Sequence, residues 1–240
     1  MRSIVIIPAR MKSIRLPNKP LIDINGIPMI IRTSLQSIKA VGRENVFVAT
    51  DSSQIENVCY KHNINTIITS SKCKTGTDRV YEASNLFNDD DIIINVQGDE
   101  PFIEPENIIK LIEFKKKSNN VVTAISNINF DSYNNNSIVK VVCANNKLLY
   151  ASRAPIPASK SNTFKEAFKQ LPIYGFTKHE LKKFKEFGKG NLESIEDVEI
   201  LRFLEMGMCV DVINLNTNSI SIDTKSDLTK LKNIIKDLED

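Results

Sequence analysis

The chain has 240 residues, of which 41% are hydrophobic and 25% are charged, a composition typical of a globular protein with a substantial core. Its 32 basic and 29 acidic residues give a formal net charge of +3, too small to predict binding to nucleic acid or to a membrane. The four cysteines form no CxxC pair, and no stretch approaches the roughly 18 apolar residues of a membrane span or resembles a signal peptide. We therefore expect a soluble cytoplasmic protein with free thiols and with no nucleic-acid or membrane partner.

The first half of the chain alternates between short apolar stretches and longer stretches with helical periodicity. A first strand is predicted at 4–7, where β-branched residues cluster, and Pro8 is expected to end it. Strands and helices that alternate at this spacing imply right-handed βαβ units. We therefore predict a three-layer α/β/α sandwich around a mainly parallel, Rossmann-like sheet. Further strands are expected at 46–50, 66–69, 92–96 and 121–125, and helices at 28–40, 51–62, 77–87 and 105–116.

The alternation breaks near Asn127, where a polar, asparagine-rich segment begins. No internal repeat and no clear linker is present, so we predict a single domain over 1–240 with a small β-rich lobe inserted at about 127–191. The remaining predictions are loops at 127–137 and 155–162, a hairpin of strands 138–143 and 148–151, strands at 171–176, 210–213 and 220–222, and helices at 192–205 and 226–238.

Charged side chains follow several predicted strands, at the sheet edge where the carboxyl ends of parallel strands meet. The loop 9–21 is rich in cations, while Asp51, the turn 97–99 and Asp223 supply carboxylates. Cations and carboxylates at one edge are typical of Mg²⁺–triphosphate sites, in which the metal bridges carboxylate and phosphate oxygens. The absence of GxxxxGK[ST] and of GxGxxG disfavours a P-loop protein and a dinucleotide-dependent oxidoreductase. The cations of the loop are Arg10, Lys12, Arg15 and Lys19.

A series of short motifs runs in order through nearly the whole chain. The motifs are IIPAR (6–10), SIRLPNKPL (13–21), VATD (48–51), TGTDR (75–79), NVQGDEP (95–101), SRAPIP (152–157), IYGF (173–176), LESIEDVEILR (192–202) and IDT (222–224). Each motif is weak alone, but the ordered set is specific. It resembles the sugar nucleotidyltransferases and, more narrowly, the family of 3-deoxy-manno-octulosonate (Kdo) cytidylyltransferases.

The resemblance implies that the anomeric hydroxyl of Kdo attacks the α-phosphate of CTP and releases pyrophosphate, with Mg²⁺ as cofactor. It also implies a homodimer, assembled through the inserted lobe. Arg10 and Lys19 would neutralise the leaving pyrophosphate, while Asp99 and Asp223 would hold Mg²⁺, and these four residues form the predicted catalytic set. Simpler roles stay open, since Lys19 could be a surface lysine and the two aspartates could cap a turn or a helix.

The matching positions divide into a nucleotide end and a sugar end. Arg153 would supply the cation that an anionic sugar needs. Glu193, Glu196 and Glu199 are three residues apart, as on one helix face, and a solvated acidic face explains Glu199 equally well. The predicted nucleotide-binding residues are Pro8, Ala9, Arg10, Ser13, Arg15, Lys19, Thr77, Arg79 and Gln97. The predicted sugar-binding residues are Gln97, Arg153, Gln170, Tyr174, Glu193 and Glu196.

Three positions depart from the family pattern. Asn18 replaces a usual glycine, which is tolerable because asparagine adopts the left-handed conformation. Gln170 replaces a usual histidine and Ile200 a usual glutamine, both on the inferred sugar side. The acceptor could therefore be Kdo, its 8-amino analogue, or another nonulosonic acid of the sialic type. A non-catalytic nucleotide-binding module of this fold is a further alternative, which the presence of the predicted catalytic residues disfavours.

Overall fold

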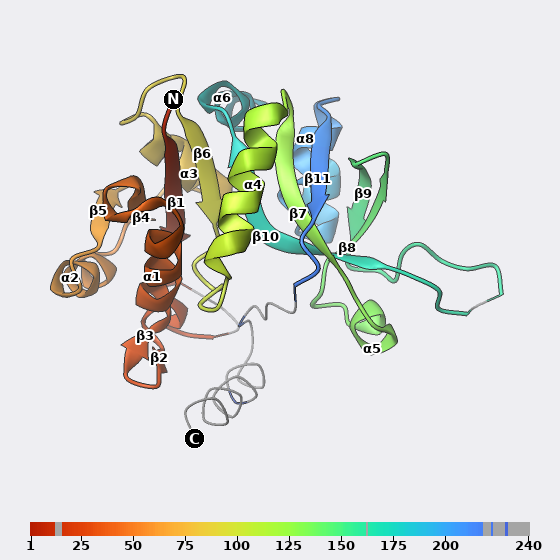
Figure 1. Cartoon of the computed structure of the whole chain (residues 1–240), viewed down its shortest axis with the longest axis horizontal. Coiled ribbons are helices and arrows are strands. Elements are labelled where there is room, and N and C mark those ends of the chain that lie inside the picture. The colour runs from red at the N-terminus through yellow and green to blue at the C-terminus, as the bar shows by residue number, and fades with distance from the viewer. Residues whose placement is uncertain (13–15, 162, 218–221, 223–228, 230–240) are drawn as a thin grey trace.

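A computed structural model of the chain describes residues 1–12, 16–161, 163–217, 222 and 229 (Figure 1). Within this part, nine strands form one sheet and a small hairpin, β2 (Asp23–Ile24) with β3 (Ile27–Pro28), stands apart. The strands of the sheet are β1 (Ser3–Ala9), β4 (Val46–Thr50), β5 (Asn65–Ile68), β6 (Ile92–Val96), β7 (Val121–Asn127), β8 (Lys140–Ala144), β9 (Lys147–Ser152), β10 (Phe168–Phe176) and β11 (Val210–Asn214).

The strand order is β5-β4-β1-β6-β10-β7-β11-β9-β8. The first four strands of this order are parallel, and so are β7 and β11. β10 enters antiparallel between β6 and β7, and the β8–β9 hairpin extends the far edge. The segment predicted as an inserted lobe, 127–191, therefore contributes a central strand to the sheet as well as the hairpin. The division of the chain into one domain with a lobe stays a prediction.

Helices cover both faces of the sheet, which confirms the predicted α/β/α sandwich. Figure 1 shows α1 and α4 on the near face, with α3, α6 and α8 behind the sheet. The β1 strand explains why the apolar run is continuous: Val5 and Ile7 pack beneath α1 and α4, while Ile4 and Ile6 face the opposite core. The helices are α1 (Met29–Val41), α2 (Ser53–Lys61), α3 (Gly76–Ser84), α4 (Pro105–Lys117), α5 (Phe130–Asn134), α6 (Lys178–Phe187), α7 (Asn191–Glu196) and α8 (Leu201–Glu205), with 3₁₀ turns η1 (Lys19–Leu21) and η2 (Arg43–Asn45).

The first strand is longer than predicted. β1 continues through Pro8 to Ala9, so the expectation that Pro8 ends the strand is wrong. Pro8 still pairs with Ala49 of β4, whereas the pairing of β1 with β6 stops at Ile6. Because the ladder toward β6 has already ended, the missing N–H of proline leaves no gap in it.

The helix predicted at 192–205 is also wrong, because the chain forms two short helices there. α7 ends at Glu196, and Asp197 takes a left-handed conformation with φ of 53° before α8 begins at Leu201. This break redirects the chain so that Glu199 reaches the start of α3. α6 was not predicted, and α5 lies in a predicted loop. The predictions at 220–222 and 226–238 fall outside the described residues, apart from Ile222 and Thr229.

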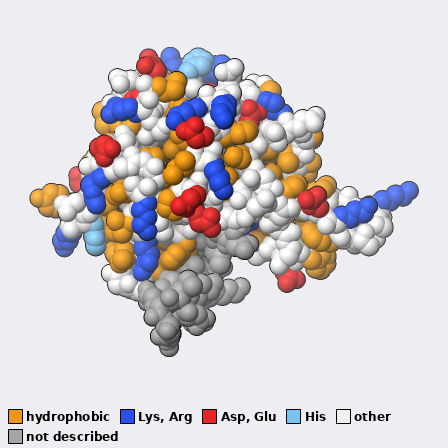
Figure 2. Space-filling view, in the orientation of Figure 1, with side chains coloured by type: hydrophobic (Ala, Val, Ile, Leu, Met, Phe, Trp, Pro, Cys, Tyr) orange, Lys and Arg blue, Asp and Glu red, His pale blue; other side chains and the backbone are white. Residues whose placement is uncertain are grey.

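The described part of the chain contains no helix long and apolar enough to cross a membrane. Figure 2 shows basic and acidic side chains interspersed over the viewed face, with no single basic patch. This pattern agrees with the small net charge of +3. The viewed face therefore lacks the clustered basic surface that marks a nucleic-acid-binding protein.

A buried ion pair joins the two helical layers at one end of the sandwich. Lys115 Nζ of α4 lies 2.9 Å from Glu180 Oε2 of α6, and their side chains are 1% and 6% exposed. Lys115 also donates to the carbonyl of Asn120 at 2.6 Å, and Glu180 accepts from the N–H of Thr177. Lys115 passes close to Gly175 of β10, where a Cβ would lie 3.1 Å from its Cβ and Cγ. The glycine therefore gives the lysine room to reach the opposite layer.

Replacement of Lys115 by methionine should strongly destabilise the fold, because it leaves the Glu180 carboxylate buried without its cation. We expect the free energy of unfolding, measured in urea, to fall by about 3–5 kcal/mol. Lys116→Met is the matched control, because Lys116 pairs with Glu113 on the surface, where the side chains are 43% and 53% exposed. The control should change stability by less than about 1 kcal/mol. Equal effects of the two substitutions would show that the buried pair has no special weight.

Candidate active site

A cleft of about 440 Å³ opens at the sheet edge where β1 and β6 end. Its walls come from the end of β1, from η1, from the start of α3, from the turn after β6 and from segment 189–199. The carboxyl ends of neighbouring parallel strands thus bring distant parts of the sequence together, as predicted. Ser13, Arg15 and Asp223 lie outside the described residues. The predicted site residues that line the cleft are Pro8, Ala9, Arg10, Lys19, Arg79, Gln97, Asp99, Arg153 and Glu193.

An ion pair bridges the cleft between the loop after β1 and the turn after β6. Lys19 Nζ lies 2.5 Å from Asp99 Oδ2, with the aspartate side chain 27% exposed. Lys19 begins η1, and the preceding Asn18 has a left-handed φ of 55°. That conformation confirms why asparagine is tolerated where a glycine is expected. A predicted phosphate-binding cation and a predicted metal ligand therefore meet in the protein.

Close backbone contacts hold the turn after β6 in place. A Cβ on Gly98 would lie 3.1 Å from the carbonyl oxygen of Pro8, so glycine permits the turn to pack against β1. The side chain of Gln97 lies against Gly76 of α3, where a Cβ would be 3.2 Å from Nε2. The N–H of Ile222 donates to the carbonyl of Asp99 at 3.1 Å. Ile222 thus meets the same turn.

Arg79 is buried in the wall of the cleft. Its guanidinium lies 3.3 Å from Asp51 Oδ1 and donates to the Thr69 hydroxyl. Arg79 therefore ties α3 to the ends of β4 and β5, and Asp51 serves as its partner at this edge. The contact of Arg79 with a nucleotide stays a prediction.

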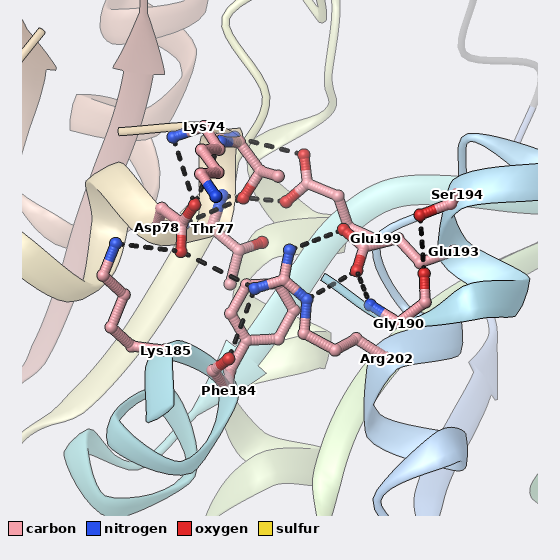
Figure 3. A network of polar contacts seen from close by, with 12 residues as sticks. Lys74, Thr77, Asp78, Phe184, Lys185, Gly190, Glu193, Ser194, Glu199 and Arg202 are labelled. Atoms are coloured by element: carbon pink, nitrogen blue, oxygen red, sulfur yellow. Dashed lines mark hydrogen bonds and ion pairs between the residues drawn. The ribbon is translucent and has the colours of Figure 1, made fainter. Parts of the chain in front are cut away.

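Glu199 caps the start of α3 (Figure 3). The sequence had left its role open and did not predict this cap. Its Oε1 accepts from the N–H of Gly76 at 3.1 Å and its Oε2 from the N–H of Thr77 at 2.9 Å. A carboxylate at a helix N-terminus is stabilised by the unpaired N–H groups and by the helix dipole. Thr77 does not line the cleft, and its N–H already donates to Glu199. The contact of Thr77 with a nucleotide stays a prediction.

Glu193 supports the cleft from within the protein. Its two carboxylate oxygens each lie 2.6 Å from the Arg202 guanidinium, and it accepts from the N–H of Gly190 (Figure 3). Arg202 in turn lies 3.6 Å from Asp78 Oδ1 and 3.5 Å from the centre of the Phe184 ring. All of these side chains except Phe184 are charged and buried together. The structure thus pairs the Glu193 carboxylate with Arg202, and the contact of Glu193 with a sugar stays a prediction.

Arg153 and Glu196 hold each other and the neighbouring turn. The carboxylate of Glu196 accepts from the Ser152 hydroxyl at 2.6 Å and from the Arg153 N–H at 2.9 Å. Burial acts to raise the pKa of Glu196, but these hydrogen bonds outweigh it and lower the pKa. Arg153 donates from its guanidinium to the carbonyls of Glu196 and Asp197 at 2.8 and 3.1 Å. Arg153 borders the cleft, whereas Glu196 does not line it.

The remaining predicted sugar-side residues lie on β10, away from the cleft lining. Burial, with a further contribution from Glu199, raises the pKa of Tyr174. Gln170 has a buried Nε2 with no hydrogen-bond partner among the described residues. Ile200 is buried in the core beneath α6 and α8, so an apolar side chain suits the position where the family usually has glutamine.

Fold and cleft together define the class of protein. The mixed sheet, with a cation of η1 and a carboxylate of the turn after β6 facing each other in the cleft, has a nucleotidyltransferase-like fold. A putative glucose-1-phosphate thymidylyltransferase from Bacillus anthracis shares this fold, with a TM-score of 0.69 at 15% identity over 98% of this chain and 96% of its own.

Sequence comparison narrows the class. A model of the cytidylyltransferase family matches residues 4–214. The 3-deoxy-manno-octulosonate cytidylyltransferase of a Nitratiruptor species is 41% identical over 95% of this chain and 97% of its own length. That of Rickettsia prowazekii is 42% identical over 94% and 92%. A solved CMP:2-keto-3-deoxy-manno-octonic acid synthetase complexed with CTP has a TM-score of 0.91 at 30% identity, covering 99% of this chain and 100% of its own. The chain therefore belongs to the family of 3-deoxy-manno-octulosonate cytidylyltransferases, which confirms the predicted family.

The thiol of Cys73, in the cleft wall, should be slow to react. Burial, together with the hydrogen bond and the charge of Glu82, raises its pKa to about 11. Glu82→Gln removes the charge but keeps an oxygen for the N–H of Ser70, so the pKa should fall and the thiolate fraction should rise. We expect alkylation by iodoacetamide near pH 8.5, followed by peptide mass mapping, to accelerate roughly threefold or more. The exposed Cys209 is the internal control and should react equally in both proteins. An unchanged rate at Cys73 would contradict the assigned role of Glu82.

Proposed function

We propose that the chain transfers the cytidylyl group of CTP to the anomeric hydroxyl of Kdo. The anomeric oxygen forms a bond to the α-phosphorus, the bond from that phosphorus to the β-phosphate oxygen breaks, and the hydroxyl proton is released. The products are CMP-Kdo and pyrophosphate. The Lys19–Asp99 pair in the cleft is the observation that carries the proposal, in a chain 41% identical to a Kdo cytidylyltransferase over 95% of its length.

The nucleotide end of the cleft suits a triphosphate. Arg10, Lys12 and Lys19 line it, and cations there offset the charge that develops on the leaving pyrophosphate. Pro8 and Ala9 would face the cytosine mainly with backbone groups. Ser13 and Arg15 complete the proposed triphosphate contacts, and Thr77, Arg79 and Gln97 the rest of the nucleotide set.

Mg²⁺ is the proposed cofactor, held by Asp99 and Asp223. The Asp99 carboxylate fits the metal because it is partly exposed in the cleft and offers the hard oxygen ligands that Mg²⁺ prefers. The N–H of Ile222, which precedes Asp223 in the sequence, donates to Asp99. No cluster of three or more acidic, histidine or cysteine residues within the described ranges could hold a metal, so phosphate oxygens would complete the coordination. Bound Mg²⁺ would neutralise phosphate charge and orient the α-phosphate.

The proposed sugar end of the cleft lies beside the nucleotide end. Gln97 and Arg153 line it, and Tyr174 lies behind it; these are the proposed acceptor contacts. Kdo is the favoured acceptor because the relatives are named for it, while its 8-amino analogue and sialic-type acids remain alternatives. A non-catalytic module is disfavoured, because Lys19 and Asp99 are both present and joined in the cleft.

Pyrophosphate release measures the proposed reaction directly. The assay should combine CTP or UTP with Kdo, 8-amino-Kdo or sialic acid, each with Mg²⁺ and with EDTA. We expect release only with CTP, Kdo and Mg²⁺ together. Equal release with another acceptor would reassign the sugar, and no release with any acceptor would overturn the proposed activity.

The same assay tests the ion pair in the cleft. Lys19→Ala removes a cation for the pyrophosphate and Asp99→Ala removes a metal ligand, so we expect each substitution to lower kcat/KM by at least about a hundredfold. Lys39→Ala, at an exposed position on α1, is the control and should retain full activity. Retention of activity in both cleft variants would exclude this mechanism.

We further propose a homodimer assembled through the lobe that carries α5. Phe130 of α5 is 56% exposed and packs edge-to-face on Phe164, beside Tyr133. Figure 2 shows hydrophobic side chains gathered in the region of α5. An apolar surface of this kind supports burial against a second copy.

Light scattering should give about twice the 27.1 kDa of one chain, or about 54 kDa. Phe130→Asp should shift the mass toward the monomer, because it places a charge in the apolar contact. Tyr60→Asp, at an exposed position on α2, should leave the mass unchanged. A monomeric mass for the unaltered protein would refute the dimer.

We also propose that the enzyme acts in the cytoplasm and that its product serves lipopolysaccharide or capsule synthesis. The four cysteines are free, which is the state expected in a reducing compartment. An activated Kdo nucleotide is the form in which such a sugar is ready for transfer to a glycan.

A further inference from the structure

Asn95 of β6 is a buried amide without a partner. The residue is 0% exposed, and neither Nδ2 nor Oδ1 has a hydrogen-bond partner among the described residues. Asn107 of α4 is similarly buried, but its Nδ2 donates to Glu104 Oε2 at 2.9 Å. A buried polar group without a partner costs about 1–3 kcal/mol, so the unpaired amide of Asn95 needs an explanation.

The amide of Asn95 faces the same side of the sheet as the active-site glutamine. Side chains alternate along a strand: Ile94 belongs to the core beneath α1 and α4, and Ile93 to the core beneath α3. Asn95 and Gln97 therefore follow Ile93 on the α3 side. Gln97 lines the cleft, so Asn95 lies one layer below the cleft floor.

The neighbouring strands supply one apolar and one polar neighbour on that face. Asn95 pairs with Ile6 of β1 and with Tyr174 of β10. Residues directly opposite on antiparallel strands have Cβ atoms about 4.5–5.5 Å apart, which brings the tyrosine ring beside the amide. Gln97 and Tyr174 are thus polar neighbours of Asn95 on this face, and both belong to the proposed sugar end.

The donor and the acceptor of the Asn95 amide indicate which kind of ligand group would satisfy it. Nδ2 donates and Oδ1 accepts, so one neutral group that both accepts and donates would satisfy the side chain. A hydroxyl has this property. A carboxylate or phosphate would satisfy only Nδ2, and it would be repelled by Glu199, whose charge already acts on Tyr174.

We propose that Asn95 is a specificity-determining residue that binds a hydroxyl group of the acceptor sugar, directly or through one water, beneath Gln97. This inference rests on the proposed function. Because Asn95 is fully buried, a direct contact would require the Gln97 side chain to turn aside, whereas a bridging water would let Gln97 stay against Gly76. The amide thus lowers the stability of the free protein and gains its partner when the acceptor binds.

Asn95→Leu separates this role from a structural one, because leucine keeps the branched shape and removes the unpaired polar atoms. We expect the melting temperature of the free protein to rise by about 2–4 °C. The KM for Kdo should rise about tenfold, while the KM for CTP stays within about twofold. Asn107→Leu is the matched control: it breaks a formed hydrogen bond, so it should lower the melting temperature and leave both KM values unchanged.

Asn95→Ala removes the amide without adding volume, and it decides the outcome if the leucine variant does not fold. Unchanged KM for Kdo in the folded variants, or an equal rise in both KM values, would overturn the proposal. Inactivity of the unaltered enzyme with Kdo would instead refute the proposed function. A crystal structure with the acceptor would distinguish a sugar oxygen at Asn95 from a bridging water.

Discussion

The ion pair between Lys19 and Asp99 joins the two loops on which the cleft depends. Both loops leave the sheet at the same edge because β1 and β6 are parallel neighbours. Gly98 then lets the second loop approach the Pro8 carbonyl, where a Cβ would be only 3.1 Å away. The charges of Lys19 and Asp99 thus neutralise each other in the cleft, so neither is left without a partner. The remaining elements of the cleft hold this arrangement in position.

The wall formed by residues 189–199 carries three glutamates whose carboxylates bind other groups of the protein. Glu199 caps α3, Glu193 binds Arg202, and Glu196 holds the backbone of Arg153. Each of these interactions ties a turn of the segment 190–199 to another part of the protein. These interactions hold the wall formed by 190–199 in place beside Gln97, which is one of the proposed acceptor contacts.

Short apolar runs in the sequence were enough to predict the central strands. The strands at 46–50 and 92–96 have the predicted bounds. The partners of Glu193 and Glu199 were not predictable, since helical spacing placed both on one face until the left-handed Asp197 separated them. The prediction that Pro8 ends the first strand also failed because it depends on other parts of the fold. Whether a proline ends a strand depends on where its neighbour's ladder ends, which is a property of the assembled sheet.

The antiparallel insertion of β10 has a consequence for the order in which the chain is assembled during synthesis. β6 and β7 are made early, yet until residues 168–176 emerge β6 lacks a partner on one side and β7 lacks both of its neighbours, β10 and β11. The nascent protein therefore carries these open strand edges while some forty further residues are added between β7 and β10. Closure of the sheet also brings Tyr174 beside Asn95, so the sheet and the proposed acceptor contacts around these two residues are completed in the same event.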